Sequence, residues 1–228
     1  MSNNNSTTPA NESAMKRIHN LIILDESGSM ESIYRAALSG VNETLQTIRG
    51  AQTRHSDQAH FVSLITFDSN HYNQIYSNTP AAKAIDITAE QYRPGGCTPL
   101  YDAMGRGITE LRRHVAKDDF VLVTIITDGY ENASREYNGK AIKSLVEALK
   151  EEGWVFTYIG ANQDVDAVAG SMSIDNCLAF EADDDSTAAM FAKESASRNI
   201  FFSKIKADVP KCSLSTGYFN SSDDSDKF

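Results

Sequence analysis

The chain has 228 residues, a formal net charge of −10 and 41% hydrophobic residues. This length suits one α/β domain with a substantial core and is short for two. The acidic balance, with no long run of Lys and Arg, argues against nucleic acid and anionic membranes as partners, and no apolar run approaches membrane-spanning length.

The chain contains three cysteines, an odd number with no CxxC pair, which predicts neither a disulfide framework nor a thiolate zinc site. The Asn- and Ser-rich start of the chain lacks the apolar segment of a secretory leader. Both features favour a reducing compartment, so we expect a cytoplasmic protein. Composition predicts a disordered arm over residues 1–15, one folded domain over 16–204 and a polar, acidic tail over 205–228.

The first predicted strand is Leu21–Leu24, whose four consecutive apolar residues indicate burial on both faces. Apolar residues at helical spacing then predict an amphipathic helix that runs to Arg49. A second apolar strand, 61–67, and a more polar strand, 71–77, are separated by a short turn. We expect a hairpin whose second strand lies at the edge of the sheet.

The irregular Pro94–Gly96 segment precedes Pro99, which is well placed as the first residue of a helix. The apolar run 120–127 resembles the first strand and also ends at an Asp. The pattern is completed by a helix around 142–149, a strand over 155–160, a short helix over 164–169, a short strand over 177–180 and a helix from 183–185 onwards. This alternation predicts an α/β fold: a doubly wound, mostly parallel six-stranded sheet with one antiparallel edge strand and helices on both faces.

Oxygen-bearing side chains follow the two most apolar strands. Asp25, Ser27 and Ser29 lie on a tight turn that Gly28 permits, so their oxygens can converge above the sheet. Asp128 follows the strand 120–127 and can face Asp25 if the two strands are neighbours. Hard oxygen ligands suit Mg²⁺ or Mn²⁺ better than a thiolate-binding metal. The alternative is that these Asp and Ser residues only cap the next helix.

A third segment, Gly96–Leu100, places Thr98 at the start of the helix, where its simplest role is that of an N-cap. Together, Asp25-x-Ser27-x-Ser29, this Thr98 segment and Thr127–Gly129 resemble the von Willebrand factor type A (vWA) domain, over about residues 18–202. The resemblance implies a Rossmann-like sheet and a metal-ion-dependent adhesion site (MIDAS). In that site Ser27, Ser29 and Thr98 supply hydroxyls, while Asp25 and Asp128 act directly or through water. Cys97 stands where the family often has Gly, which bears on loop flexibility more than on ligation.

Such a site favours binding over catalysis. Mg²⁺ takes about six oxygen ligands, and hydroxyls and waters leave its charge under-neutralised, so an acidic side chain of a protein partner completes the shell. The resemblance to stand-alone bacterial vWA proteins implies an adaptor, as in some tellurium-resistance clusters or beside ATPases. We expect a metal-dependent protein-binding module, not an enzyme, with Ser27 and Asp128 on exposed turns.

The enzymatic alternative is a Mg²⁺-dependent phosphohydrolase of the haloacid-dehalogenase type, in which an Asp after the first strand is the nucleophile. Those enzymes carry a second Asp two residues later, where this chain has Ser27, which cannot act as the acid or base. The chain also lacks a P-loop and a Gly-x-Ser-x-Gly elbow. A purely structural domain with a vestigial metal site is a third possibility, against which the complete ligand set argues.

The C-terminal segment carries Asp223, Asp224 and Asp226, and its simplest role is that of a solvated tail. If the chain is free from Asp208 onwards, it is long enough to bring these carboxylates to the metal site as internal competitors. Leu214, Tyr218 and Phe219 are the apolar residues of this segment that can instead dock on the domain.

Overall fold

A six-stranded sheet forms the centre of the molecule in the computed structural model, which describes residues 15–161 and 163–220. The strands lie in the order β3-β2-β1-β4-β5-β6, and β3 alone of these six runs antiparallel to its neighbour. Their bounds are β1 (Lys16–Asp25), β2 (Gln58–Phe67), β3 (Tyr72–Pro80), β4 (Phe120–Thr127), β5 (Val155–Ala161) and β6 (Asn176–Phe180). The predicted fold class is confirmed.

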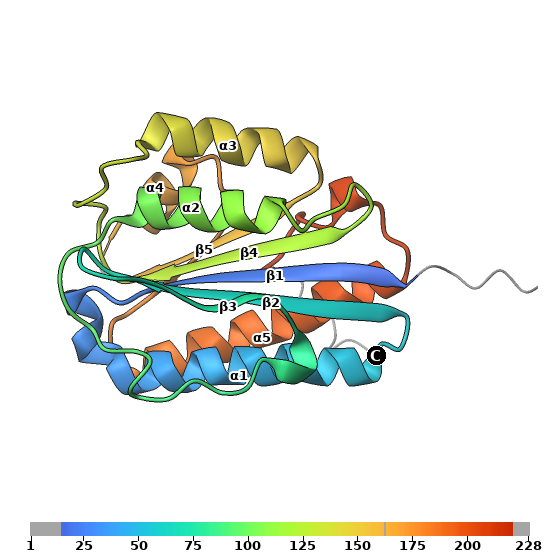
Figure 1. Ribbon diagram of the computed structural model, residues 1–228, viewed down its shortest axis with the longest axis horizontal. Helices are drawn as coiled ribbons and strands as arrows, with labels where there is room; N and C mark the ends of the chain where they lie inside the picture. The colour runs from blue at the N-terminus through green and yellow to red at the C-terminus, as the bar shows by residue number, and fades with distance from the viewer. Residues whose placement is uncertain (1–14, 162, 221–228) are drawn as a thin grey trace, which may run out of the picture.

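Helices cover both faces of this sheet (Figure 1). One face carries α1 (Tyr34–Arg54) and α5 (Asp184–Lys206), and the other carries α2 (Leu100–Arg112), α3 (Gly139–Glu151) and α4 (Val165–Ser171). Three 3-10 turns join these elements: η1 (Gly28–Ile33), η2 (Ala81–Lys83) and η3 (Lys211–Ser213). No helix among the described residues is both long and apolar enough to cross a bilayer.

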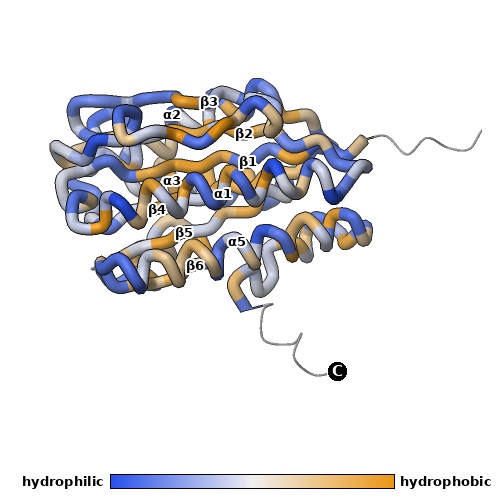
Figure 2. Tube along the Cα trace, turned by 90° about the horizontal axis from the view of Figure 1, so that it is seen from below, coloured by the Kyte–Doolittle hydropathy of each residue, from blue (hydrophilic) through white to orange (hydrophobic). Residues whose placement is uncertain are grey.

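Strand β1 is buried on both faces, as its sequence predicts, because helices cover each side. Leu21 and Ile23 pack in the cluster with α2, α3 and α4, while Ile22 and Leu24 pack with α1 and α5. All four side chains are fully buried, and each contributes about 1.5–3 kcal/mol by leaving water. Apolar colour runs along β1 in the interior of the molecule (Figure 2).

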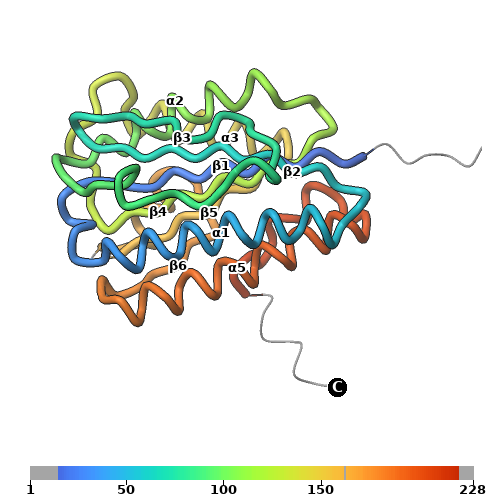
Figure 3. Tube along the Cα trace, turned by 60° about the horizontal axis from the view of Figure 1, so that its bottom comes forward, coloured from blue at the N-terminus to red at the C-terminus, as the bar shows by residue number. Residues whose placement is uncertain are grey.

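Helix α5 lies beside α1 (Figure 3) and is held to the sheet by hydrogen bonds from Arg198, a fully buried residue that also forms an ion pair within the helix. Arg198 Nη2 lies 2.6 Å from Glu194 Oε1 on the same helix. The guanidinium also donates to Asn20 Oδ1 on β1 at 2.9 Å and to Thr124 Oγ1 on β4 at 2.8 Å. Breaking a buried pair by removing one partner costs about 3–5 kcal/mol, so this network fixes the position of α5 on β1 and β4.

The C-terminal segment is not a free tail as far as Asn220, so the predicted boundary at residue 205 is wrong. Helix α5 continues to Lys206, and Leu214, Tyr218 and Phe219 are buried in the core. The apolar side chains of this segment outweigh its polar composition, because α1 and α5 leave an apolar surface for them to cover. Residues 1–14, most of the predicted N-terminal arm, lie outside the described ranges.

The docked segment lies at the amino ends of the strands, opposite the edge at which β1 ends (Figure 1). Lys211 Nζ donates to the carbonyl oxygens of Lys117 and Asp119, just before β4, at 2.8 and 2.7 Å. The eight residues after Asn220, which include Asp223, Asp224 and Asp226, lie outside the described ranges. The internal competitor is therefore withdrawn, because it required a free chain from Asp208.

Candidate metal-binding site

The predicted site residues lie at the carboxyl ends of β1 and β4, which are hydrogen-bonded neighbours in the sheet. The two strands run parallel with Leu24 opposite Ile126, so Asp25 and the residues after Thr127 reach the same edge. The order of strands in the chain reverses here, since β1 is followed by β2 on one side and β4 lies on the other. Ligands of doubly wound sheets bind at such a switch point.

Hydrogen bonds join the two serines to the two carboxylates. Ser29 Oγ donates to Asp128 Oδ1 at 2.5 Å, and the Oγ atoms of Ser27 and Ser29 lie 3.2 Å apart. The backbone N–H of Ser27 donates to Asp25 Oδ1 at 2.7 Å. Ser27 precedes η1 but makes no side-chain cap hydrogen bond to it, so the helix-capping interpretation of this turn is not supported.

Thr98 joins the same group of oxygens, although it is about 70 residues from the serines in sequence. A Cβ atom built on Gly129 would lie 3.1 Å from Thr98 Oγ1, 3.2 Å from Ser29 Oγ and 3.8 Å from Asp25 Oδ2. Three of the predicted ligand atoms therefore surround one small space, which glycine leaves open. Helix α2 begins at Leu100 and its N-cap residue is Pro99, so Thr98 does not occupy the predicted N-cap position.

The expectation that Ser27 and Asp128 lie on exposed turns is wrong. The exposed fractions are 2% for Ser27 and 3% for Asp128, and Asp25 is fully buried. The loop before α2 covers the turn, since the Gly28 N–H donates to the Gly96 carbonyl oxygen at 3.1 Å. Burial raises the pKa of Asp25 to about 6, despite opposing hydrogen bonds from Thr127 and Ser27. Burial also raises the pKa of Asp128.

The residues present fit a divalent cation that binds hard oxygens. Asp128 Oδ2 is buried and has no hydrogen-bond partner among the described residues, so this oxygen is available to a cation. Nowhere in the described ranges do three His, Cys, Asp or Glu side chains gather as a ready ligand cluster. The candidate metal donors at this edge are the carboxylates of Asp25 and Asp128 and the hydroxyls of two serines and Thr98. Such a set of hard oxygens is suited to Mg²⁺ or Mn²⁺.

Two neighbouring residues orient this group, and the sequence analysis assigned a role to neither. Thr127 Oγ1 donates to Asp25 Oδ2 at 2.6 Å and accepts from the Gly129 N–H at 3.1 Å. Asn132 holds Thr98 from both sides: its Oδ1 accepts from the Thr98 N–H at 2.8 Å, and its own N–H donates to the Thr98 carbonyl oxygen at 3.1 Å. Thr127 directly precedes Asp128, which was a usable signal, but no sequence pattern indicates the Asn132 contact.

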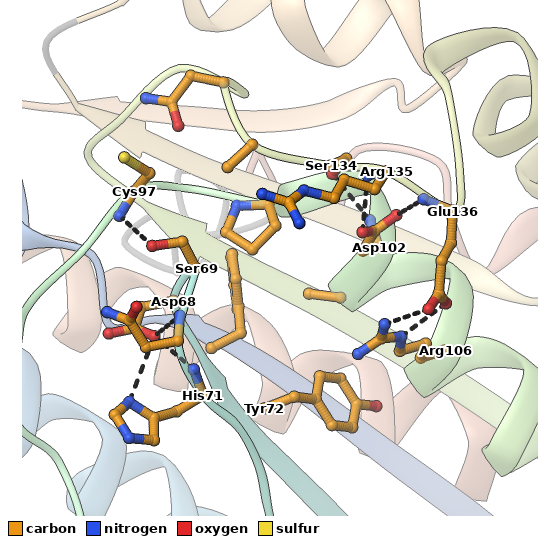
Figure 4. Close-up of a pocket in the computed structure, with 16 residues that line it drawn as sticks. Asp68, Ser69, His71, Tyr72, Cys97, Asp102, Arg106, Ser134, Arg135 and Glu136 are labelled. Atoms are coloured by element: carbon orange, nitrogen blue, oxygen red, sulfur yellow. Dashed lines mark hydrogen bonds and ion pairs between the residues drawn. The ribbon is translucent and has the colours of Figure 1, made fainter.

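The loop after β4 also holds the start of α2. Asp102 accepts hydrogen bonds from the backbone N–H groups of Arg135 and Glu136 (Figure 4) and of Tyr137, at 2.8–2.9 Å. These bonds lower the pKa of its carboxyl against the effect of burial. Glu131 Oε2 accepts from the Tyr101 N–H at 3.0 Å. The Thr98 and Asp128 loops are therefore one connected unit.

The Thr98 loop also depends on Gly96, whose φ of +68° is a conformation that residues with a Cβ rarely adopt. A Cβ at this position would lie 2.7 Å from Ser69 Oγ. The next residue, Cys97, is exposed, and its backbone N–H donates to the same Ser69 Oγ at 3.0 Å. Its side chain faces a cavity of about 780 Å³ between the β2–β3 turn and the loop after β4 (Figure 4).

A family model, the von Willebrand factor type A domain, matches residues 21–197. The chain belongs to the vWA family. Comparison with curated proteins finds no match. A search of solved structures finds vWA-like folds, among them domains of a pili tip protein and of a pilus adhesin.

Three of these structures show how far the likeness extends. The PilB minor pilin from Streptococcus sanguinis has a TM-score of 0.59 and 12% identity, over 82% of this chain and 62% of that one. The vWF domain of the type V pili tip protein Mfa5 from Porphyromonas gingivalis has a TM-score of 0.56 and 10% identity, over 82% and 96%. The pilus adhesin SpaC from Lactobacillus rhamnosus GG has a TM-score of 0.56 and 15% identity, over 82% and 30%. This vWA chain thus spans about 62% of the PilB structure, and such identities establish the fold alone.

Proposed function

We propose that this vWA domain is a metal-dependent protein-binding module, with Mg²⁺ or Mn²⁺ held by Asp25, Ser27, Ser29, Thr98 and Asp128. The bound cation supplies an electrophilic centre for an acidic side chain of a protein partner. The observation that carries the proposal is the buried, unpartnered Oδ2 of Asp128 within a group of converging hydroxyls. A buried carboxylate oxygen without a partner is costly, and a cation relieves that cost.

The hydrogen bonds of Asp25 support binding rather than catalysis. Its Oδ1 accepts from the Ser27 N–H, and its Oδ2 accepts from Thr127 Oγ1. Both Asp25 oxygens therefore already accept a hydrogen bond. These bonds weaken Asp25 as the nucleophile that the phosphohydrolase alternative requires. We accordingly propose that the protein is not an enzyme.

An exposed aromatic residue beside the site supports a protein partner. Tyr130 lies two residues after Asp128 and is 55% exposed. Aromatic side chains are enriched at protein interfaces, because they bury a large area and lose little conformational entropy. A tyrosine next to a metal site that lacks one ligand therefore suits a partner that covers the loop after β4.

We propose that the module acts in the cytoplasm. All three cysteines are free, and Cys97 and Cys212 are exposed; free thiols persist in reducing compartments. Cell fractionation followed by alkylation of the thiols tests this placement, and recovery of the protein outside the cell would contradict it.

The metal part of the proposal is tested by titrating Mn²⁺ into the chelator-treated protein, with electron paramagnetic resonance as the readout, and by competing with Mg²⁺. We expect one site that Asp128→Asn weakens at least about tenfold, whereas Asp118→Asn, an exposed carboxylate before β4, leaves it unchanged. Equal Mn²⁺ affinities for the two variants would reject the site.

The partner part is tested with a fluorescent Gly-Gly-Glu-Gly-Gly peptide and its Gln counterpart, both blocked at the N-terminus and amidated at the C-terminus so that the Glu side chain is the one carboxylate. The Glu peptide is expected to bind in Mg²⁺ and not in EDTA, while the Gln peptide does not bind in either. Equal binding of the two peptides would show that no carboxylate completes the metal site. Turnover of a generic phosphate ester that requires Asp25 would favour the phosphohydrolase alternative instead.

A further inference from the structure

A second carboxylate at the end of β1 has no role in the site described above. Glu26 follows Asp25 directly and is only 5% exposed. Its Oε1 accepts a hydrogen bond from the Arg93 N–H, whereas its Oε2 is buried and has no hydrogen-bond partner among the described residues. A buried carboxylate oxygen in this state lacks the positive or hydrogen-bonding group that would offset its loss of water.

Glu26 lines a cavity of about 370 Å³ at the same end of the sheet as the metal site. The cavity lies between β3, which contributes Asn73, and the loop before the Thr98 segment, which contributes Glu90 and Arg93. Glu90 adds a second carboxylate to its wall. Arg93 lines the cavity too, and no ion pair of the described residues joins it to Glu26.

The chemistry of this cavity favours an organic cation over a metal ion. The described lining of the cavity contains no Ser or Thr hydroxyls, unlike the group of oxygens around Asp128, and it includes the cationic Arg93. A single buried carboxylate with one free oxygen is instead matched by one ammonium or guanidinium group. The net charge of −10 also attracts basic ligands over a longer range.

We propose that this cavity takes a Lys or Arg side chain of the segment whose carboxylate completes the metal site. Consecutive residues at the end of a strand point to opposite faces, and their Cα atoms are about 3.8 Å apart. Asp25 therefore serves the metal site while Glu26 serves the neighbouring cavity. A partner segment with an acidic and a basic residue a few positions apart reaches both. The partner rests on the proposed function, but the cation site itself does not.

The cation site is tested alone with argininamide and its neutral analogue citrullinamide, in EDTA, so that no metal takes part. In protein labelled with ¹³C-glutamate, the Glu26 carboxyl resonance is assigned by its loss in Glu26→Gln, which keeps an acceptor for the Arg93 N–H. Argininamide is expected to shift this resonance with saturation, and citrullinamide is not. The exposed Glu31 resonance, assigned with Glu31→Gln, is the control and should not saturate. No saturable shift at Glu26, or equal shifts with both compounds, would overturn the proposal.

The pairing with the metal site is tested with Gly-Gly-Glu-Gly-Gly peptides in which one flanking Gly is replaced by Lys, on either side. In Mg²⁺, the best Lys peptide is expected to bind wild type about tenfold more tightly than the Glu-only peptide, and Glu26→Gln should remove this advantage while melting at the wild-type temperature. A Glu-only peptide that binds in Mg²⁺ without any gain from Lys refutes the pairing and leaves the proposed function standing. No Mg²⁺-dependent binding of any peptide refutes the proposed function, and the argininamide result then decides the cation site.

Discussion

Ser29 donates a hydrogen bond from its Oγ to Asp128 Oδ1 at 2.5 Å, across 99 positions of sequence. Because the hydroxyl proton points at the carboxylate, the lone pairs of Ser29 Oγ are free to face a cation or the nearby Ser27 hydroxyl. One bond thereby fixes the distance between the β1 and β4 loops and the orientation of a ligand. Ligation of a cation by Asp128 needs the ionised carboxylate, so metal binding depends on pH.

Metal affinity is expected to fall in acid because the ligands bind as carboxylates. Burial raises the pKa of Asp25 to about 6, so affinity should be constant above about pH 7 and fall about tenfold per pH unit below 6. Mn²⁺ titration between pH 5 and 8 measures this, and an unchanged affinity at pH 5 would contradict it.

Stability of the metal-free protein is a poor readout of the same group. The raised pKa of Asp25 means that the fold takes up a proton more readily than the unfolded chain, which adds stability as pH falls from about 6 to 3.8. Burial lowers the pKa of His60 to about 3, so the unfolded chain protonates first and stability is lost below about 6.5. Asp25 and His60 therefore change the free energy of unfolding in opposite directions as the pH falls. Metal affinity is the clearer measure of Asp25 titration.

Asp128→Ala is expected to leave the metal-free protein within about 1 kcal/mol of wild type, although Asp128 is buried. The change removes the bond to Ser29 but also removes a buried carboxylate with an unpartnered oxygen. Ile23→Ala should cost about 2–5 kcal/mol, because it leaves a cavity in a fully buried strand. Urea unfolding in EDTA compares the two, and equal losses would show that Asp128 is a structural residue.

Asn132→Ala is expected to weaken Mn²⁺ binding about tenfold by releasing the Thr98 backbone. If Asn132 acts only by positioning Thr98, the same change should have little effect in a Thr98→Ala background, which a double-mutant cycle on Mn²⁺ affinity measures. Additive losses would mean that Asn132 acts independently of Thr98. The melting temperature of each variant controls for unfolding.

Removal of residues 221–228 should change neither stability nor metal affinity, whereas removal of 208–228 should destabilise the fold. The longer deletion takes away the buried side chains of Leu214, Tyr218 and Phe219, and losing even one large core side chain costs about 3–5 kcal/mol. Thermal unfolding of both truncations checks this. A longer truncation that melts like wild type would contradict the docking of this segment.

The sequence predicted the strands well because burial on both faces leaves uninterrupted apolar runs, as in Leu21–Leu24. It predicted which residues meet at the site because parallel strands share one edge. It failed where contacts come from loops: nothing in the local pattern pairs Asn132 with Thr98. It also misjudged the exposure of Ser27 and Asp128. The loop that contains Gly96 covers this region, and Gly96 is about 70 residues from Ser27 and about 30 from Asp128 in sequence. The polar composition of residues 207–220 favoured a free tail, whereas the structure shows the stated alternative, in which Leu214, Tyr218 and Phe219 dock on the domain.

The described chain begins at the edge opposite the metal site. Lys16, at the start of β1, donates through Nζ to the Ile205 carbonyl oxygen at 2.7 Å, so the first strand begins beside the end of α5. If the module is held at the start of β1, the Asp25 and Glu26 edge therefore points outward into solution. A large protein can then approach that edge without steric conflict with whatever holds the module in place.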